Sequence, residues 1–218
     1  MKLFFIEKLK ELLAFLAKAT IAKYQPSVIG ITGSVGKTSA KEAIYATLKD
    51  ARIVRVARGN LNTEFGLPLT ILGDWSPEEL KLVSRGGPKG ATFAKSAFWL
   101  KVILTSFGRL ISRVKYPEIL ILEYGVQKPG DMRYLLEVAK PNIGVMTAIG
   151  EVPVHVEFFS GKESIAREKS RLLEAVPAIG FVILNSDDEI VYEMGERVRA
   201  HTMTFGFNND SDIHIGNL

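Results

Sequence analysis

Short apolar runs that alternate with helix-forming segments are the feature that most constrains the fold of this chain. The runs are rich in β-branched residues and are predicted as strands, at residues 27–32, 52–57, 116–125, 142–150, 180–185 and 201–207. Helical patterns fall between them, at about 39–49, at 131–139 and after 160. Strands that alternate with helices form a mostly parallel sheet through right-handed crossovers. We therefore predict an α/β fold, with a three-layer, mostly parallel sheet flanked by helices.

Two of the later helices are preceded by the spacing of a capping box, in which a Ser and a Glu three residues apart satisfy each other's backbone amides. The pairs are Ser160 with Glu163 and Ser186 with Glu189. We expect one helix to begin at each pair.

Polar residues follow four of the predicted strands. They lie at residues 32–38, at Glu123, at 147–155 and at 185–188. In parallel sheets, ligands bind beyond the carboxyl ends of the strands. The sequence therefore predicts one site at this edge of the sheet.

The sequence TGSVGKTS, residues 32–39, has the parts of a phosphate-binding loop between a buried strand and a helix. Glycines let backbone N–H groups approach an anion, a lysine adds charge, a hydroxyl binds Mg²⁺, and the helix presents its positive end. The strict G-x-x-x-x-G-K-[ST] spacing fails because Ile31 stands at the first glycine position, and a G-x-G-x-x-G fingerprint fails as well. The alternative is a tight turn with a surface lysine. We predict a P-loop NTPase-like fold that binds a nucleoside triphosphate through Thr32, Gly33, Ser34, Val35, Gly36, Lys37, Thr38 and Ser39.

Glu123 ends an apolar strand, where an unpaired carboxylate would be costly. It needs a cation or hydrogen-bond donors, so we consider either Mg²⁺ shared with the nucleotide or backbone and arginine donors. His155 and Lys169 also follow the predicted strand 142–150. Taken alone, they would be a structural histidine and a solvated lysine.

Composition sets broad limits on location and partners. The chain has 218 residues, is 47% hydrophobic, has no cysteine and carries a formal net charge of +4. It can bury a large core, and the absence of cysteine fits a reducing compartment. The small basic excess does not indicate a nucleic-acid partner. Charges interrupt the apolar residues 3–24, so we predict neither a spanning helix nor a signal peptide there.

Two segments have the pattern of amphipathic helices. In residues 3–24 the apolar face is Phe5, Ile6, Leu9, Leu12, Leu13 and Leu16. In residues 94–115 it is Phe98, Trp99, Ile103, Phe107, Leu110 and Ile111. Each is expected to pack on a protein core, and the alternative is peripheral contact with a membrane.

Five stretches together resemble the ATP-dependent Mur ligases, and most closely the members that join D-alanyl-D-alanine to a UDP-N-acetylmuramoyl-tripeptide. In chain order they are GITGSVGKTSAKEAI, NLNTEFGLPLTIL, LEYGVQKPGDM, TAIGEVPVHVEFFSGKESIAREKSRLLEAV and ILNSDDE. The resemblance covers about residues 26–207 and implies the cytoplasm of a bacterium as the location. It implies cell-wall precursor synthesis, with UDP-MurNAc-peptide and D-Ala-D-Ala as substrates, and ATP and Mg²⁺ as cofactors.

The resemblance also assigns roles to single residues. Lys37, Glu123, His155 and Lys169 would be catalytic, and Thr38, Glu123 and His155 would bind the metal. Lys169 matches a lysine that is carbamylated in several Mur ligases. The segment Asn62, Thr63 and Glu64 would lie near the substrate, although Thr63 replaces the usual Asn. Asn185 would contact the nucleotide.

Members of this family also have a domain for the UDP-sugar before the central domain, and one that closes over ATP after it. We interpret residues 26–218 as a C-terminally truncated central domain, preceded by a helix at 1–25 and containing a helical insertion at 91–115. The missing ligase domains are expected partners. The alternatives are another Mur or folylpolyglutamate-type ligase, a non-catalytic or partner-dependent nucleotide-binding module, and an unrelated P-loop kinase.

Overall fold

The structure is a computed structural model and describes residues 2–59, 61–84, 87, 90, 92–150 and 158–216. One seven-stranded sheet crosses it, in the order β2-β3-β1-β4-β5-β6-β7, and every strand pair is parallel. The strands are β1 (Ser27–Thr32), β2 (Val54–Val56), β3 (Ile119–Glu123), β4 (Ile143–Met146), β5 (Phe181–Asn185), β6 (His201–Gly206) and β7 (Ile213–His214). The predicted α/β fold with a parallel sheet is confirmed. The short β7, at one edge of the sheet, was not predicted.

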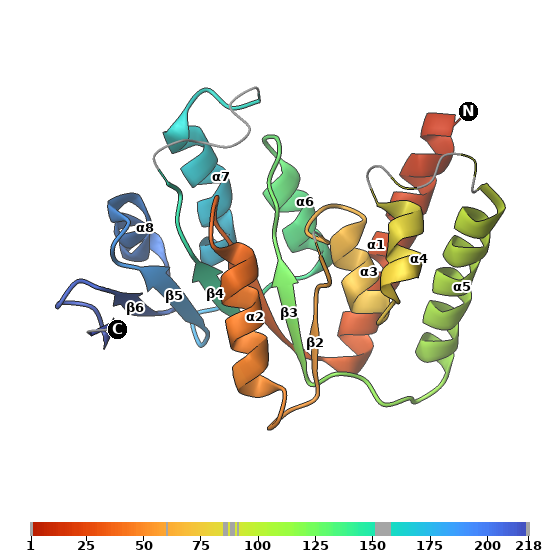
Figure 1. Cartoon of the computed structure of the whole chain (residues 1–218), viewed down its shortest axis with the longest axis horizontal. Helices are drawn as coiled ribbons and strands as arrows, with labels where there is room; N and C mark the ends of the chain where they lie inside the picture. Colours follow the sequence, from red (N-terminus) through yellow and green to blue (C-terminus); the bar gives the residue numbers. More distant parts are fainter. Residues whose placement is uncertain are drawn as a thin grey trace.

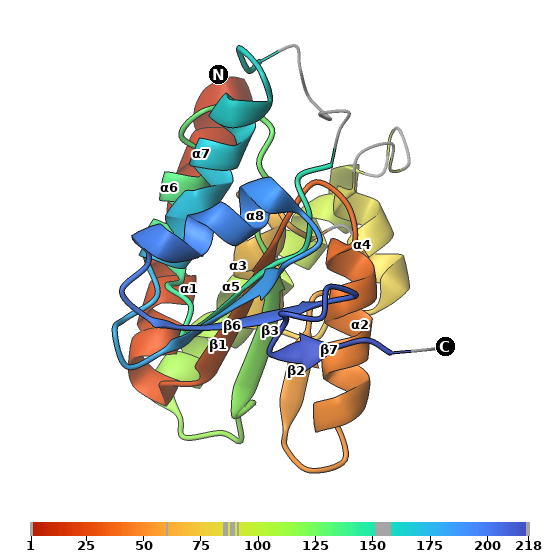
Figure 2. The same cartoon turned by 90° about the vertical axis from the view of Figure 1, so that its left-hand side faces the viewer.

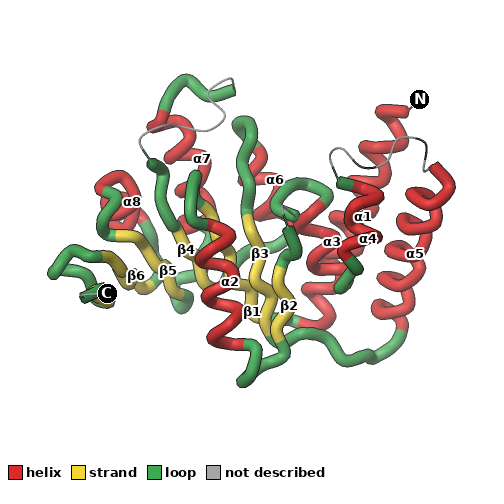
Figure 3. The backbone as a smooth tube through the Cα atoms, in the orientation of Figure 1, coloured by secondary structure: helices red, strands yellow, loops and turns green. Residues whose placement is uncertain are grey.

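Helices cover both faces of the sheet (Figures 1 and 2). They are α1 (Lys2–Tyr24), α2 (Lys37–Leu48), α3 (Gly66–Leu72), α4 (Pro77–Val83), α5 (Thr92–Ile111), α6 (Asp131–Val138), α7 (Lys162–Glu174), α8 (Glu189–Glu193) and the 3₁₀ helix η1 (Met194–Arg197). Helix α2 packs on one face, and α1, α3, α6 and α7 pack on the other. The tube in Figure 3 shows α4 and α5 beyond the β2 edge of the sheet.

Alternation along the strands explains why both faces are apolar. Ile29, Ile31 and Ile121 point to the α2 side, whereas Leu120 and Leu122 point to the larger helical layer. A strand covered on both faces has no solvent-exposed side, so its sequence reads as an almost continuous apolar run.

Helix α1 packs on α3 and α5. Leu13 and Leu16 are fully buried, but Phe5 and Ile6 are exposed, so the predicted apolar face is buried only in the later part of the helix. At the other end, Lys23 Nζ donates to the carbonyl oxygens of Arg109, Leu110 and Ser112. This lysine therefore caps the C-terminus of α5.

Helix α5 packs only part of the predicted row, Phe98, Trp99 and Leu110, against the core. Phe98 is buried as expected, but its neighbours in the buried row are Val102 and Ser106. Phe107 and Ile111 are exposed instead. No helix among the described residues combines the length and the apolar character needed to cross a lipid bilayer.

The two predicted capping boxes are wrong. Helix α7 begins after Gly161 without a side-chain cap, and α8 is capped by Asp188, whose side chain accepts from Val191 N–H. A complete capping box occurs at α4, where Ser76 and Glu79 each accept a backbone N–H from the other. Ser-to-Glu spacing alone does not reveal which residue precedes the first helical turn.

Candidate nucleotide-binding site

The loop between β1 and α2 is held against the end of β4. Ser34 N–H donates to the carbonyl oxygen of Ala148 over 2.6 Å, and the Thr147 hydroxyl donates to the Val35 carbonyl oxygen over 2.6 Å. Gly33 has a φ of +147°, and a Cβ there would lie 2.0 Å from Thr147 Oγ1. Only glycine fits this position, because it has no Cβ and tolerates positive φ.

Helix α2 begins directly after this loop. Gly36, with a φ of +82°, is its N-cap and provides no side-chain cap, and no acidic residue stands in the first turn. The first N–H groups of the helix and its positive dipole end are thus uncompensated by a carboxylate of that turn. A helix start of this kind attracts an anion.

Two lysines converge on one carbonyl oxygen of the loop. Lys37 Nζ and Lys169 Nζ each donate to the Gly33 carbonyl oxygen over 2.8 Å. Burial lowers the pKa of Lys37, partly offset by the charge of Glu123. Burial and the nearby charge of Lys37 lower the pKa of Lys169 to about 7. Bringing two ammonium groups together in a protein interior is costly unless an anion joins them.

A cavity of about 120 Å³ lies beside these lysines, which is room for a phosphate-sized group. Its lining residues are Gly33, Ser34, Lys37, Asn62, Gly125, Val126, Gln127, Ile165 and Lys169. The loop glycine, both lysines and the end of β3 therefore meet at the edge of the sheet where the sequence predicts a site.

Glu123 is buried at the end of β3, as predicted, but its partner was not foreseen. Lys41 Nζ lies 3.1 Å from Glu123 Oε1, and both side chains are 1% exposed. Lys41 lies on the side of α2 that carries Ile44 and Leu48, which pack on the sheet. A lysine in the middle of an apolar helix face was a signal that could have identified it.

The residues that would hold Mg²⁺ are suited to it. Thr38 Oγ1 lies 3.5 Å from Glu123 Oε1, and a hydroxyl with a carboxylate is the oxygen donor set that Mg²⁺ takes beside nucleotide phosphates. His155, the third predicted ligand, lies outside the described residues. Within the described part of the chain, no group of three or more His, Asp or Glu side chains gathers at a metal-binding spacing.

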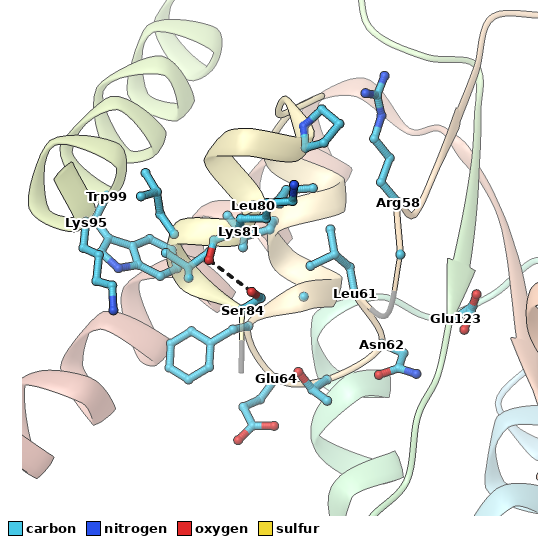
Figure 4. A pocket seen from close by; sticks show the side chains of 18 of the residues that line it. Arg58, Leu61, Asn62, Glu64, Leu80, Lys81, Ser84, Lys95, Trp99 and Glu123 are labelled. Carbon is cyan, nitrogen blue, oxygen red and sulfur yellow. Dashed lines mark hydrogen bonds between the residues drawn. The ribbon is translucent and has the colours of Figure 1, made fainter. Parts of the chain in front are cut away.

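A second and larger cavity, of about 1090 Å³, lies beside the loop. Asn62, Thr63 and Glu64 line it, so the predicted substrate segment does border a cavity. Figure 4 shows Glu123 at one end of this cavity, and Lys95 and Trp99 of α5 at the other. Lys37, Asn62 and Gln127 line both cavities. The two spaces therefore adjoin at the phosphate-binding loop.

Five predicted residues are not among the described residues that line these cavities: Thr32, Val35, Gly36, Ser39 and Asn185. The Thr32 hydroxyl donates to the carbonyl oxygen of Tyr124 over 3.0 Å, which ties β1 to the segment after β3. Asn185 Oδ1 accepts from Asp187 N–H, and Ser39 is exposed in the first turn of α2.

Glu168, beside Lys169, is also buried, and its carboxylate accepts from Gly130 N–H and Met132 N–H at the start of α6.

The fold and the site define an α/β domain with a phosphate-binding loop of the nucleotide-binding type. Residues 106–218 match the family model described as the Mur ligase middle domain. The chain belongs to this family.

Similar proteins cover most of this chain. The UDP-N-acetylmuramoyl-tripeptide--D-alanyl-D-alanine ligase of Mycobacterium tuberculosis is 31% identical over 190 residues, which is 87% of this chain and 29% of the relative. The enzyme of the same name from Synechocystis is 28% identical and covers 96% of this chain and 40% of the relative. The crystal structure of the MurF ligase of Thermotoga maritima in complex with ADP is 28% identical, with a TM-score of 0.70 over 95% of this chain and 39% of that one. The chain thus spans less than half the length of these relatives.

Proposed function

We propose that this domain binds ATP for a MurF-type ligase, which joins a carboxylate to an amine in the synthesis of peptidoglycan precursors. The observation that carries the proposal is that the small and the large cavity share Lys37, Asn62 and Gln127. A terminal phosphate in the small cavity is thereby next to a space large enough for a second substrate. The ADP-bound structure of the Thermotoga relative supports a nucleotide as the phosphate donor.

The proposed reaction has two steps. A carboxylate oxygen of the peptide substrate attacks the γ-phosphorus of ATP, the bond to the β-phosphate oxygen breaks, and ADP leaves. The amine nitrogen of the second substrate then attacks the carbonyl carbon of the acyl phosphate, loses a proton and displaces inorganic phosphate. Catalysis of phosphoryl transfer consists mainly of positioning and of neutralising the charge on the phosphates.

This chain's residues supply both effects. Lys37 and the N–H groups at the start of α2 neutralise and orient the outer phosphates. Thr38 and Glu123 would hold Mg²⁺, which adds charge neutralisation when it is bound. Lys169, with a pKa of about 7, reaches the same loop and can contact the γ-phosphate region, either as an amine or as a carbamate.

The names of the relatives suggest UDP-MurNAc-tripeptide and D-Ala-D-Ala as the substrates. The large cavity is lined by the basic residues Arg58, Lys81 and Lys95 together with apolar side chains, which suits a large anionic substrate. A reaction of this kind, which consumes ATP and a nucleotide-linked substrate, belongs in the bacterial cytoplasm. Peripheral contact of residues 94–115 with a membrane stays a prediction.

Titration calorimetry with Mg-ATP tests the first part of this proposal. We expect the wild-type chain to bind, and Lys37→Ala to weaken binding at least about tenfold, as loss of a charge-assisted contact would. The matched control is Lys49→Ala, an exposed lysine just after the same helix. Absence of Mg-ATP binding by the folded wild-type chain would refute the proposal.

Phosphate release tests the second part. We expect inorganic phosphate to appear only when ATP, UDP-MurNAc-tripeptide and D-Ala-D-Ala are present together. Binding of Mg-ATP without phosphate release would instead favour a non-catalytic or partner-dependent nucleotide-binding module. Release with a folate substrate and glutamate, but not with the muramoyl peptide, would favour a folylpolyglutamate-type ligase.

A further inference from the structure

Helix α5 presents a row of apolar side chains to solvent. The row has a spacing of 7, 4, 3 and 4 residues, which keeps it on one face of the helix, and its members are between 42% and 88% exposed: Phe93, Leu100, Leu104, Phe107 and Ile111. From Phe93 to Ile111 the row is about 27 Å long, at the rise per residue of an α-helix. Figures 1 and 3 show α5 at the outer edge of the molecule, beyond α4.

The opposite face of α5 is already occupied by the protein core, through Phe98, Val102 and Ser106. The cations of the helix lie toward its borders. Lys101 pairs with Glu79 of α4, and the guanidinium of Arg109 donates to the carbonyl oxygen of Leu72. Helix α5 is thus apolar on the side that faces water as well as on the buried side. A continuous exposed row of this kind indicates an interaction surface.

The charge of the surrounding segment indicates what covers this face. Between Glu79 and Glu118 the sequence has eight Lys and Arg residues and no acidic residue. The rest of the chain has 20 basic and 24 acidic residues, a net charge of −4. Residues 80–117 of the sequence, which include α5, therefore account for more than the net positive charge of the chain. Arg113 and Lys115 are exposed just beyond the C-terminus of the helix.

We propose that the exposed face of α5 docks on an anionic lipid surface, with the helix lying in the plane of the interface. Phe93, Leu100, Leu104, Phe107 and Ile111 enter the boundary between headgroups and acyl chains, and the exposed Arg113 and Lys115 meet the lipid phosphates. A second copy of the chain is a poorer occupant, because two segments of charge +8 would meet. This docking is independent of the proposed ligase activity.

Sedimentation with lipid vesicles tests the proposal on the full chain. We expect the protein to pellet with vesicles of phosphatidylcholine and phosphatidylglycerol, and to be released in part by high salt. The double variant Leu104→Glu with Phe107→Glu should lower the bound fraction at least about tenfold. Ile179→Glu is the control, because Ile179 is an exposed apolar residue outside α5, in the turn between α7 and β5, and this variant should bind like wild type.

Four results would overturn the proposal. One is recovery of the wild-type chain in the supernatant with anionic vesicles. Equal pelleting with vesicles of phosphatidylcholine alone would remove the anionic requirement. Equal loss of binding in the Ile179→Glu control would remove the assignment to α5. The fourth is a dimer in solution, detected by light scattering, that the double variant dissociates, since it would make this face a contact between copies. Circular dichroism and thermal unfolding of each variant show whether it is folded.

Discussion

Lys41 Nζ lies 3.1 Å from Glu123 Oε1, and this ion pair joins helix α2 to the end of strand β3 underneath the phosphate-binding loop. Both side chains are buried, so each would be costly without the other. The pair also directs Glu123 Oε1 toward the Thr38 hydroxyl, at 3.5 Å. The carboxylate that we propose as a metal ligand is therefore held in place by the protein itself.

The ion pair leads to a prediction about stability. Lys41→Met should lower the free energy of unfolding by about 3–5 kcal/mol, because it removes the ion-pair partner of the buried Glu123 carboxylate. Adding Glu123→Gln to Lys41→Met should restore part of the loss, because the amide carries no charge. Urea denaturation measures both changes.

Lys49→Met is the control for these variants, because Lys49 is exposed next to the same helix. It should change the free energy of unfolding by less than about 0.5 kcal/mol. A loss in Lys41→Met no larger than in this control would show that the pair does not stabilise the fold.

The sheet and the loop could be predicted from the sequence because local patterns determine them. The run SVIGIT predicts β1 whatever surrounds it, and the residues from Gly33 to Thr38 predict a phosphate-binding loop by their order. The partner of Glu123 could not be predicted in the same way, because Lys41 and Glu123 are 82 positions apart and meet only after β1 and β3 pair. The buried row of α5 was predicted only in part, because both sides of this helix are apolar and periodicity alone does not tell which side faces the core.

Lys169 leads to a prediction about pH. Its pKa falls from 10.5 to about 7 on folding, so the unfolded chain keeps a proton between these values that the folded protein releases. The free energy of unfolding should therefore rise with pH across this window, by up to about 5 kcal/mol, and this gain should be lost as the pH falls toward 7. Lys169→Met has no titrating amine at this position, so it lacks this pH-dependent part of the free energy of unfolding. In urea denaturation, the free energy of unfolding of wild type should increase relative to that of the variant from pH 7 to pH 10. A difference between the two that does not change with pH would contradict the lowered pKa of Lys169.

The same lowered pKa makes carbamylation of Lys169 feasible, since CO₂ reacts with the neutral amine. With ¹³C-labelled bicarbonate near neutral pH, we expect a carbamate carbon resonance from the wild-type protein. Lys169→Arg keeps a cation but offers no neutral amine, and it should lack the signal. A spectrum that is identical for the two proteins would argue that Lys169 acts as an amine.

Gly33 leads to a prediction about the shape of the loop. In Gly33→Ala the added Cβ would meet Thr147 Oγ1 at 2.0 Å, at a φ that alanine rarely adopts. The loop must then move, and Mg-ATP affinity should fall at least about tenfold in calorimetry while the sheet stays folded. Gly108→Ala is the control, since nothing lies within 4 Å of its added Cβ in the last turn of α5. It should raise the free energy of unfolding by about 0.5–1 kcal/mol, and unchanged nucleotide affinity in Gly33→Ala would contradict the assigned loop geometry.

A substitution at Thr38 can distinguish a contact to the metal from a contact to the nucleotide. Thr38→Val keeps the shape of the side chain and removes the hydroxyl that lies 3.5 Å from Glu123 Oε1. The affinity for ATP with Mg²⁺ should fall about tenfold, whereas the affinity for ATP in the presence of EDTA should stay the same, because the hydroxyl is proposed to serve the metal. Thr47→Val is the matched control on the same helix, where the hydroxyl donates to the Ala43 carbonyl oxygen on an exposed face, and it should leave both affinities unchanged. An equal loss with and without Mg²⁺ in Thr38→Val would show that this hydroxyl contacts the phosphates directly, and Glu123 would then be the one proposed metal ligand left among the described residues.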